Sequence, residues 1–147
     1  RQMCIETAFE FGKETANISR RYHDFFCTII LSVICKQFAQ GKQPYTAEEI
    51  SKEHKIPIRL TKKILYELQD MHLIYEAGNE DNRKDTGYVP GMDINRLTVG
   101  MLLSRLDSTG SEAFKIDRKQ YSASWEALVK ARDEYIYHNN QILLKDL

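Results

Sequence analysis

Four side chains between residues 59 and 66 have the types and the spacing that suit contact with a nucleic acid. Cationic groups at helical spacing could contact phosphates, while a tyrosine ring could touch a sugar or a base. The alternative is an ordinary solvated helix face with no ligand at all. The candidate contacts, for a nucleic acid or for a partner protein, are Arg59, Lys62, Lys63 and Tyr66.

The charge around these candidates does not favour DNA. The whole chain of 147 residues carries 21 basic and 21 acidic side chains. Non-specific affinity for DNA comes mainly from released counterions, so a neutral domain should bind DNA poorly. DNA binding is therefore possible but not favoured. Between residues 46 and 75, Lys52, Lys55, Arg59, Lys62 and Lys63 are balanced by Glu48, Glu49, Glu53, Glu67 and Asp70, and the following loop adds Glu80, Asp81 and Asp85 against Arg83 and Lys84.

Catalytic and metal-binding patterns are missing from the sequence. It has no His-Glu-x-x-His, no Cys-x-x-Cys and no phosphate-cradling glycine loop. No histidine stands at a local spacing from a cysteine that suggests an activated thiol. We therefore expect a chain that is not an enzyme, with no metal and no cofactor, and with buried thiols. The histidines are His23, His54, His72 and His138, and the cysteines are Cys4, Cys27 and Cys35.

The element that must support this region is a long helix over residues 18–38. Its apolar residues follow helical spacing and continue round to the other side of the helix, so it should be covered on both sides. A second helical face in residues 4–16 is the candidate cover. Gly41 and Pro44 end the long helix.

A helix-turn-helix pattern follows. Thr46 and Glu49 form a capping box, and Pro57 suits the first turn of the next helix, which runs to about Met71. Residues 73–76 and 88–90 read as two strands joined by a polar loop. The fold class is mainly α, a winged helix-turn-helix with a small two-stranded β wing and flanking N- and C-terminal helices. The second helix should bury Leu60, Ile64, Leu65, Leu68 and Met71, and should leave Arg59, Lys62, Lys63, Tyr66, Glu67 and Asp70 towards solvent.

Two further helices are expected after the wing. Thr98 is the expected cap of a short helix over residues 99–106. The last helix begins near Ser124 and carries apolar pairs at a seven-residue repeat, so it either packs on its own domain or forms a coiled coil. The expected organisation is an N-terminal helical segment (1–17), a winged-helix domain (18–107), a linker (108–123) and a C-terminal helix (124–147).

The order of these segments resembles two families. The stretch "TAEEISKEHKIPIRLTKKILYELQDMHLI" followed by "YVPGMDINRLTVGMLLSRLD" is similar to bacterial winged-helix repressors that sense iron-sulfur clusters. In those repressors a helix start like Leu97-Thr98-Val99 follows the wing, with clustered cysteines nearby. This sequence has no cysteine after Cys35, so the resemblance does not extend to that cofactor site.

The closer resemblance is to the cytoplasmic C-terminal region of the YihY/BrkB family of bacterial inner-membrane proteins, formerly labelled ribonuclease BN. The matching stretches are "FEFGKETANISRRYHDFF" and the two segments quoted above, over roughly residues 9–118. The resemblance implies a membrane-spanning part upstream of Arg1 and a location at the cytoplasmic face of the inner membrane.

From the resemblance and the charge together, we expect a non-catalytic cytoplasmic winged-helix module that contacts a protein partner or self-associates. No catalytic set supports the ribonuclease label. The alternative is a winged-helix DNA-binding transcriptional regulator.

Overall fold

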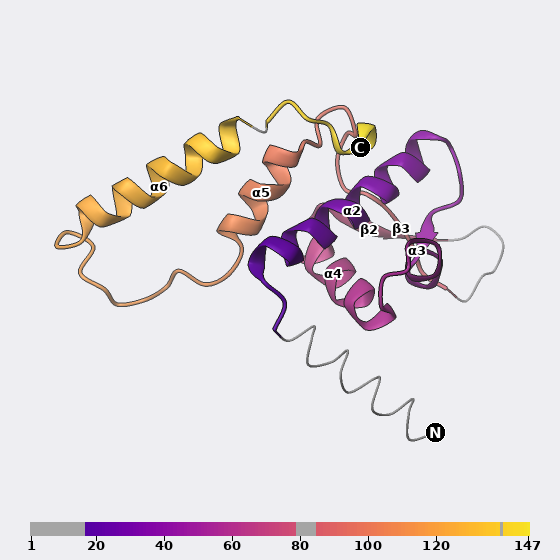
Figure 1. The fold of residues 1–147 in the computed structure, drawn as a ribbon, viewed down its shortest axis with the longest axis horizontal. Helices are drawn as coiled ribbons and strands as arrows, with labels where there is room; N and C mark the ends of the chain where they lie inside the picture. The colour runs from indigo at the N-terminus through magenta and orange to yellow at the C-terminus, as the bar shows by residue number, and fades with distance from the viewer. Residues whose placement is uncertain (1–16, 79–84, 139) are drawn as a thin grey trace, which may run out of the picture.

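The structure, a computed structural model, describes residues 17–78, 85–138 and 140–147. Its centre is α2 (Arg20–Ala39), and α4, α5, β3 and the C-terminal turn all pack against this helix (Figure 1). Ser19 caps α2, because its Oγ accepts the Tyr22 N–H at 3.1 Å. The expected cover of this helix by residues 4–16 lies outside the described residues. Fully buried residues of α2 are Cys27, Ile30, Leu31, Ile34 and Cys35.

The helix-turn-helix consists of α3 (Ala47–His54) and α4 (Ile58–Asp70). The predicted cap at Thr46 is confirmed, since the Glu49 N–H donates to Thr46 Oγ1 at 3.2 Å. Lys55 ends α3 in the left-handed region, with φ 54°. The predicted buried stripe of α4 is also confirmed. It comprises Leu60, Ile64, Leu65 and Leu68, with Met71 just beyond the helix.

The wing belongs to a three-stranded antiparallel sheet in the order β1-β3-β2. The strands are β1 (Tyr45–Thr46), β2 (Ile74–Ala77) and β3 (Gly87–Pro90). The sequence pattern predicted β2 and β3, and the structure adds β1, whose Tyr45 pairs with Tyr88. The mainly α winged helix-turn-helix fold is confirmed.

Two helices follow the wing, α5 (Val99–Ser108) and α6 (Ser122–Tyr137). Thr98 caps α5 as expected, with Oγ1 3.1 Å from the Met101 N. The C-terminal helix ends at Tyr137, well before the expected end of the element, and the chain then returns to the body. The short helix η1 (Leu144–Asp146) contacts α2, and Leu144 is fully buried.

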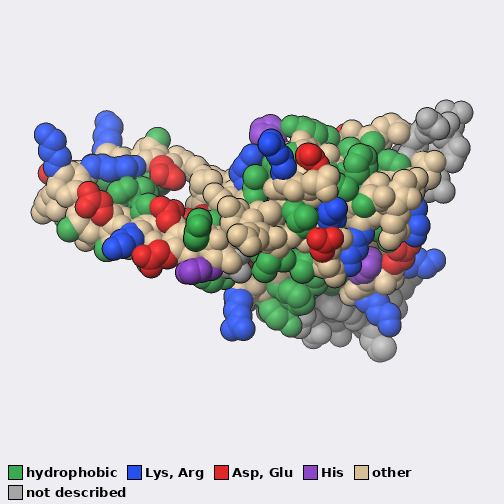
Figure 2. Space-filling view, turned by 90° about the horizontal axis from the view of Figure 1, so that it is seen from above, with side chains coloured by type: hydrophobic (Ala, Val, Ile, Leu, Met, Phe, Trp, Pro, Cys, Tyr) green, Lys and Arg blue, Asp and Glu red, His purple; other side chains and the backbone are tan. Residues whose placement is uncertain are grey.

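The helix α6 projects from the winged-helix body as an arm (Figure 1). None of its residues is buried. Seen from above, the arm carries hydrophobic side chains among charges of both signs (Figure 2). The described part of the chain thus consists of a packed winged helix and one helix with most of its surface uncovered.

Candidate nucleic-acid interface

The four predicted contact residues lie together on the outer face of α4. All four side chains are exposed, and Tyr66 is 73% exposed. The opposite face of α4 packs against α2 and α3. The structure therefore brings Arg59, Lys62, Lys63 and Tyr66 onto one surface, while their binding role remains a prediction.

Three of the five acidic residues in this region are held by partners inside the domain. Glu49 is hydrogen-bonded by the Thr46 hydroxyl, and Glu53 accepts a hydrogen bond from the Tyr45 hydroxyl. Glu67 was expected to face solvent, but it turns to α2 and lies 2.5 Å from His23 Nε2. Glu49 and Glu53 belong to α3 and keep their charge, but Glu67 turns away from the outer face of α4, so this face carries one acidic side chain fewer than the sequence indicated.

Fewer of the basic side chains than of the acidic side chains in this region have a partner within the described residues. Lys62 Nζ lies 3.7 Å from Glu48 Oε1, but both side chains are more than half exposed, so this pair is weak. No other ion pair within the described residues involves a cation of α3, α4 or the turn between them. Four exposed cations of this region have no ion pair with a carboxylate of the described residues: Lys52, Lys55, Arg59 and Lys63.

A groove of about 410 Å³ separates α4 from the wing. Its lining includes Glu48, Glu76 and Asp85, with Lys62 and Tyr66 on the α4 side. The acidic groups belong to α3 and to the wing, whose tip (79–84) lies outside the described residues. A phosphate backbone would therefore meet a more favourable surface at Arg59 and Lys63 than along this groove.

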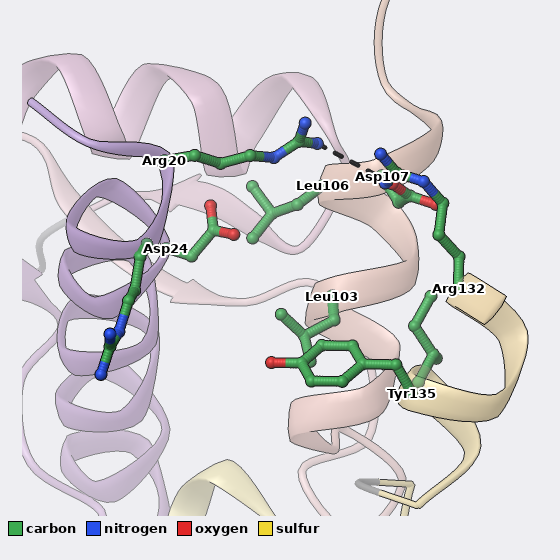
Figure 3. Close-up of a pocket in the computed structure, with 9 residues that line it drawn as sticks. Arg20, Asp24, Leu103, Leu106, Asp107, Arg132 and Tyr135 are labelled. Atoms are coloured by element: carbon green, nitrogen blue, oxygen red, sulfur yellow. Dashed lines mark hydrogen bonds and ion pairs between the residues drawn. The ribbon is translucent and has the colours of Figure 1, made fainter. Parts of the chain in front are cut away.

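A second cleft of about 410 Å³ lies between α2, α5 and α6 (Figure 3). Asp107 of α5 accepts a hydrogen bond from the guanidinium of Arg132 of α6. Arg20 of α2 places Nη2 3.8 Å from the same carboxylate oxygen. These ion pairs connect the arm to the body, and Leu106 and Tyr135 line the cleft beside them.

His23, Cys27 and Glu67 form a cluster that was not predicted from the sequence. Their ligand atoms all lie within 4.8 Å of one another. Burial lowers the pKa of His23, but hydrogen bonds and charges from Asp24 and Glu67 outweigh it and raise that pKa above 6.5. Burial, with Glu67 and Asp24, raises the pKa of Cys27 to about 12. The four-residue spacing of His23 and Cys27 on one helix could have indicated that these two side chains are neighbours. Glu67 is 44 residues from His23 in the sequence, so no local pattern could have added it to the cluster.

Comparison with known proteins relates the fold to transcriptional regulators. CymR (YrzC), the global cysteine regulator of B. subtilis, matches with a TM-score of 0.58 and 16% identity, over 88% of this chain and 94% of CymR. The T. potens IscR matches with a TM-score of 0.59 and 15% identity, over 88% of this chain and 84% of IscR. CymR of S. aureus matches with a TM-score of 0.56 and 14% identity, over 84% and 93% of the two chains. No protein-family model and no curated protein matches the sequence.

These matches correct the interpretation of the sequence as a YihY/BrkB module. The structural neighbours are transcriptional regulators and not membrane proteins, and they match over most of their own length. The assignment to that family is therefore wrong, as is the inferred role as a module of an inner-membrane protein. Within the described residues, no helix has both the length and the apolar character needed to cross a membrane. At such low identities the similarity establishes the fold alone.

Proposed function

We propose that this chain is a DNA-binding transcriptional regulator in which α4 enters the major groove. The observation that carries the proposal is the exposed stripe of Arg59, Lys62, Lys63 and Tyr66 on the second helix of the helix-turn-helix. In helix-turn-helix proteins this helix contacts base edges. The regulators with a similar fold support the same use. The proposal assigns no catalytic role to the chain.

The neutral charge of the chain determines how such a regulator would distinguish its specific sites from other DNA. With 21 basic and 21 acidic residues, it gains little from long-range attraction to DNA. Discrimination must come from base contacts, for which Arg59 and Lys63 are suited because arginine and lysine pair with the O6 and N7 acceptors of guanine. The expected behaviour is weak binding to random duplexes and much tighter binding to particular sites.

Self-association through the arm is the second part of the proposal. Exposed apolar side chains of α6 include Trp125, Leu128 and Tyr135, with Val129 half-buried between them. A mainly apolar groove of about 620 Å³ lies between this helix and the segment before it. A second copy of the chain that covers this surface would form a dimer with two α4 helices. Such a dimer would suit a two-fold symmetric DNA site whose half-sites are about 34 Å apart. In sedimentation velocity, Leu128→Asp should shift the chain to a monomer while Lys130→Glu leaves it unchanged.

The experiment for DNA binding starts from duplexes selected by the full chain from a random-sequence pool. Fluorescence anisotropy then measures affinity for a selected duplex. Replacement of Lys62 and Lys63 by glutamate should weaken binding at least about thirtyfold. This factor corresponds to a loss of binding free energy of about 1 kcal/mol or more for each of the two contacts.

The matched control reverses two exposed lysines that lie outside α4 and do not line the self-association groove. Lys42→Glu with Lys130→Glu changes the net charge equally but lies outside the proposed interface. Equal losses in the two double variants would show that α4 is not the reading helix. Failure to select any duplex would overturn the proposal as a whole.

A further inference from the structure

Three side chains of different chemistry meet where α4 packs against α2. His23 and Cys27 lie one turn apart on α2, and the distance from Cys27 Sγ to His23 Nε2 is 3.8 Å. Glu67 reaches over from α4 and places Oε2 2.5 Å from the same nitrogen. The His23 and Glu67 side chains are 21% and 30% exposed, and Cys27 is buried, so the cluster is largely shielded from water but open at one side.

The geometry points to a binding site for one divalent transition metal ion of the zinc type, held by His23, Cys27 and Glu67. Imidazole, thiolate and carboxylate are the three ligand classes that zinc uses in proteins. Three protein ligands leave a fourth position for water. A hard cation such as Mg²⁺ is excluded by this ligand set, because it prefers oxygen ligands alone.

Two of the three separations between ligand atoms can be compared with those around a tetrahedral ion, and the third, from sulfur to the Glu67 oxygen, is within 4.8 Å. With a Zn–S distance of about 2.3 Å and Zn–N and Zn–O distances of about 2.0–2.1 Å, tetrahedral angles separate sulfur from nitrogen by about 3.5 Å and nitrogen from oxygen by about 3.4 Å. The observed separations are 3.8 Å and 2.5 Å. Sulfur must approach by a few tenths of an ångström, and the Glu67 carboxylate must withdraw by about 0.9 Å.

Asp24 supplies the outer partner that metal-bound histidines require. Its Oδ1 lies 3.1 Å from His23 Nδ1. When Nδ1 carries the proton and donates to Asp24, the lone pair of Nε2 is available to an ion, and Glu67 Oε2 lies 2.5 Å from this nitrogen. Cys27 Sγ lies 3.8 Å from Nε2 and 3.9 Å from Nδ1, nearly equidistant from the two ring nitrogens. A carboxylate behind a ligating histidine fixes its tautomer and its orientation, and such partners are typical of zinc sites.

The ion would take the place of a proton between His23 and Glu67. Cysteine binds such an ion as the thiolate, so Cys27 must release its proton when the ion binds. Two carboxylates beside the site, Asp24 and Glu67, favour the added positive charge. The ion would join α2 to the inner side of α4, and this inference does not depend on whether the outer side of α4 binds DNA.

The test uses the full chain with Cys4→Ser, so that Cys27 and Cys35 are the remaining cysteines. Titration with Co²⁺ should give one ion per chain and a thiolate-to-cobalt charge-transfer band, which Zn²⁺ should remove by competition. Cys27→Ser should abolish the band, and Glu67→Gln and His23→Gln should each weaken Zn²⁺ binding at least about tenfold. Cys35→Ser is the matched control, because Cys35 is also buried in α2 but lies outside the cluster.

Circular dichroism of each variant checks that the fold is retained. Glu67→Gln keeps the shape of the side chain, so its Zn²⁺ affinity can be measured even if Cys27→Ser does not fold. The inference is overturned by the absence of a charge-transfer band in the parent chain. It is also overturned by a band that Cys35→Ser removes, or by Zn²⁺ affinity that neither Glu67→Gln nor His23→Gln changes.

Discussion

Gly100 is the position where one added methyl group should loosen the C-terminal segment. A Cβ at this residue would lie 2.7 Å from the Asn140 Cα and 3.0 Å from both the Asn140 N and the Ile136 carbonyl oxygen. All three are backbone atoms, so no side chain can rotate away to make room. In Gly100→Ala, the segment after α6 must therefore move away from α5.

The loss of stability in Gly100→Ala depends on the contacts that hold the segment after α6. The segment is held by the Val99 N–H to the Ile142 carbonyl at 2.8 Å, by the Leu144 N–H to the Leu97 carbonyl at 3.0 Å, and by the buried Leu144 side chain. Complete release would cost about 1 kcal/mol for each hydrogen bond and about 1.5–3 kcal/mol for the side chain. Strain in a packed structure costs about 1–3 kcal/mol, and the helix propensity of alanine returns up to about 1 kcal/mol. We expect a net loss of about 1–2 kcal/mol.

Urea denaturation followed by circular dichroism measures this loss, with Gly78→Ala as control because a Cβ there meets no atom within 4 Å. In a Leu144→Ala background, Gly100→Ala should lose much less stability, since the segment is already weakened. The reasoning is refuted when Gly100→Ala is as stable as the parent chain, or when its effect is unchanged in the Leu144→Ala background.

Three further predictions concern the helix-turn-helix and the first strand. Thr46→Ala should lower the free energy of unfolding by about 1 kcal/mol, because the Glu49 N–H loses its acceptor, and an unchanged urea midpoint and slope would contradict the capping role. Lys55→Gly should raise stability by about 1 kcal/mol in the same assay, because Lys55 has φ 54°, whereas Lys52→Gly inside α3 should lower it. Burial and the hydrogen bond to Glu53 raise the pKa of Tyr45 to about 12. Because the folded pKa lies above the unfolded value of about 10, this contribution to stability is complete below pH 10 and is lost as the pH rises towards 12. Tyr45→Phe should remove a late step from the spectrophotometric tyrosine titration, and a titration curve with the same late step would disprove the assignment.

Local signals in the sequence were enough to predict most of the winged helix. The caps at Thr46 and Thr98 and the buried stripe from Leu60 to Leu68 depend on neighbours within one or two helical turns, and the structure confirms them. The first strand was missed because two residues, Tyr45 and Thr46, are too few to show an alternating pattern. Its existence depends on β3, more than 40 positions later.

The candidate site was only partly predictable for the same reason. Helical spacing placed Arg59, Lys62, Lys63 and Tyr66 on one face, as the structure has them. The same spacing left Glu67 towards solvent, because it contains no information on the α2 side chain that this carboxylate reaches. The family assignment failed because it used the order of segments and no diagnostic motif, and winged-helix proteins share that order.

Sequence-specific DNA binding is measured by the ratio of two affinities. Anisotropy titrations of the full chain against a selected duplex and a scrambled duplex of the same composition should be run at several salt concentrations. We predict at least about 10³-fold tighter binding to the selected duplex at physiological salt. The logarithm of the affinity for both duplexes should fall with the logarithm of salt concentration, by about 0.9 for each phosphate contacted. Equal affinities for the two duplexes would contradict the account, because a neutral winged helix that does not distinguish sequences has no basis for use as a regulator.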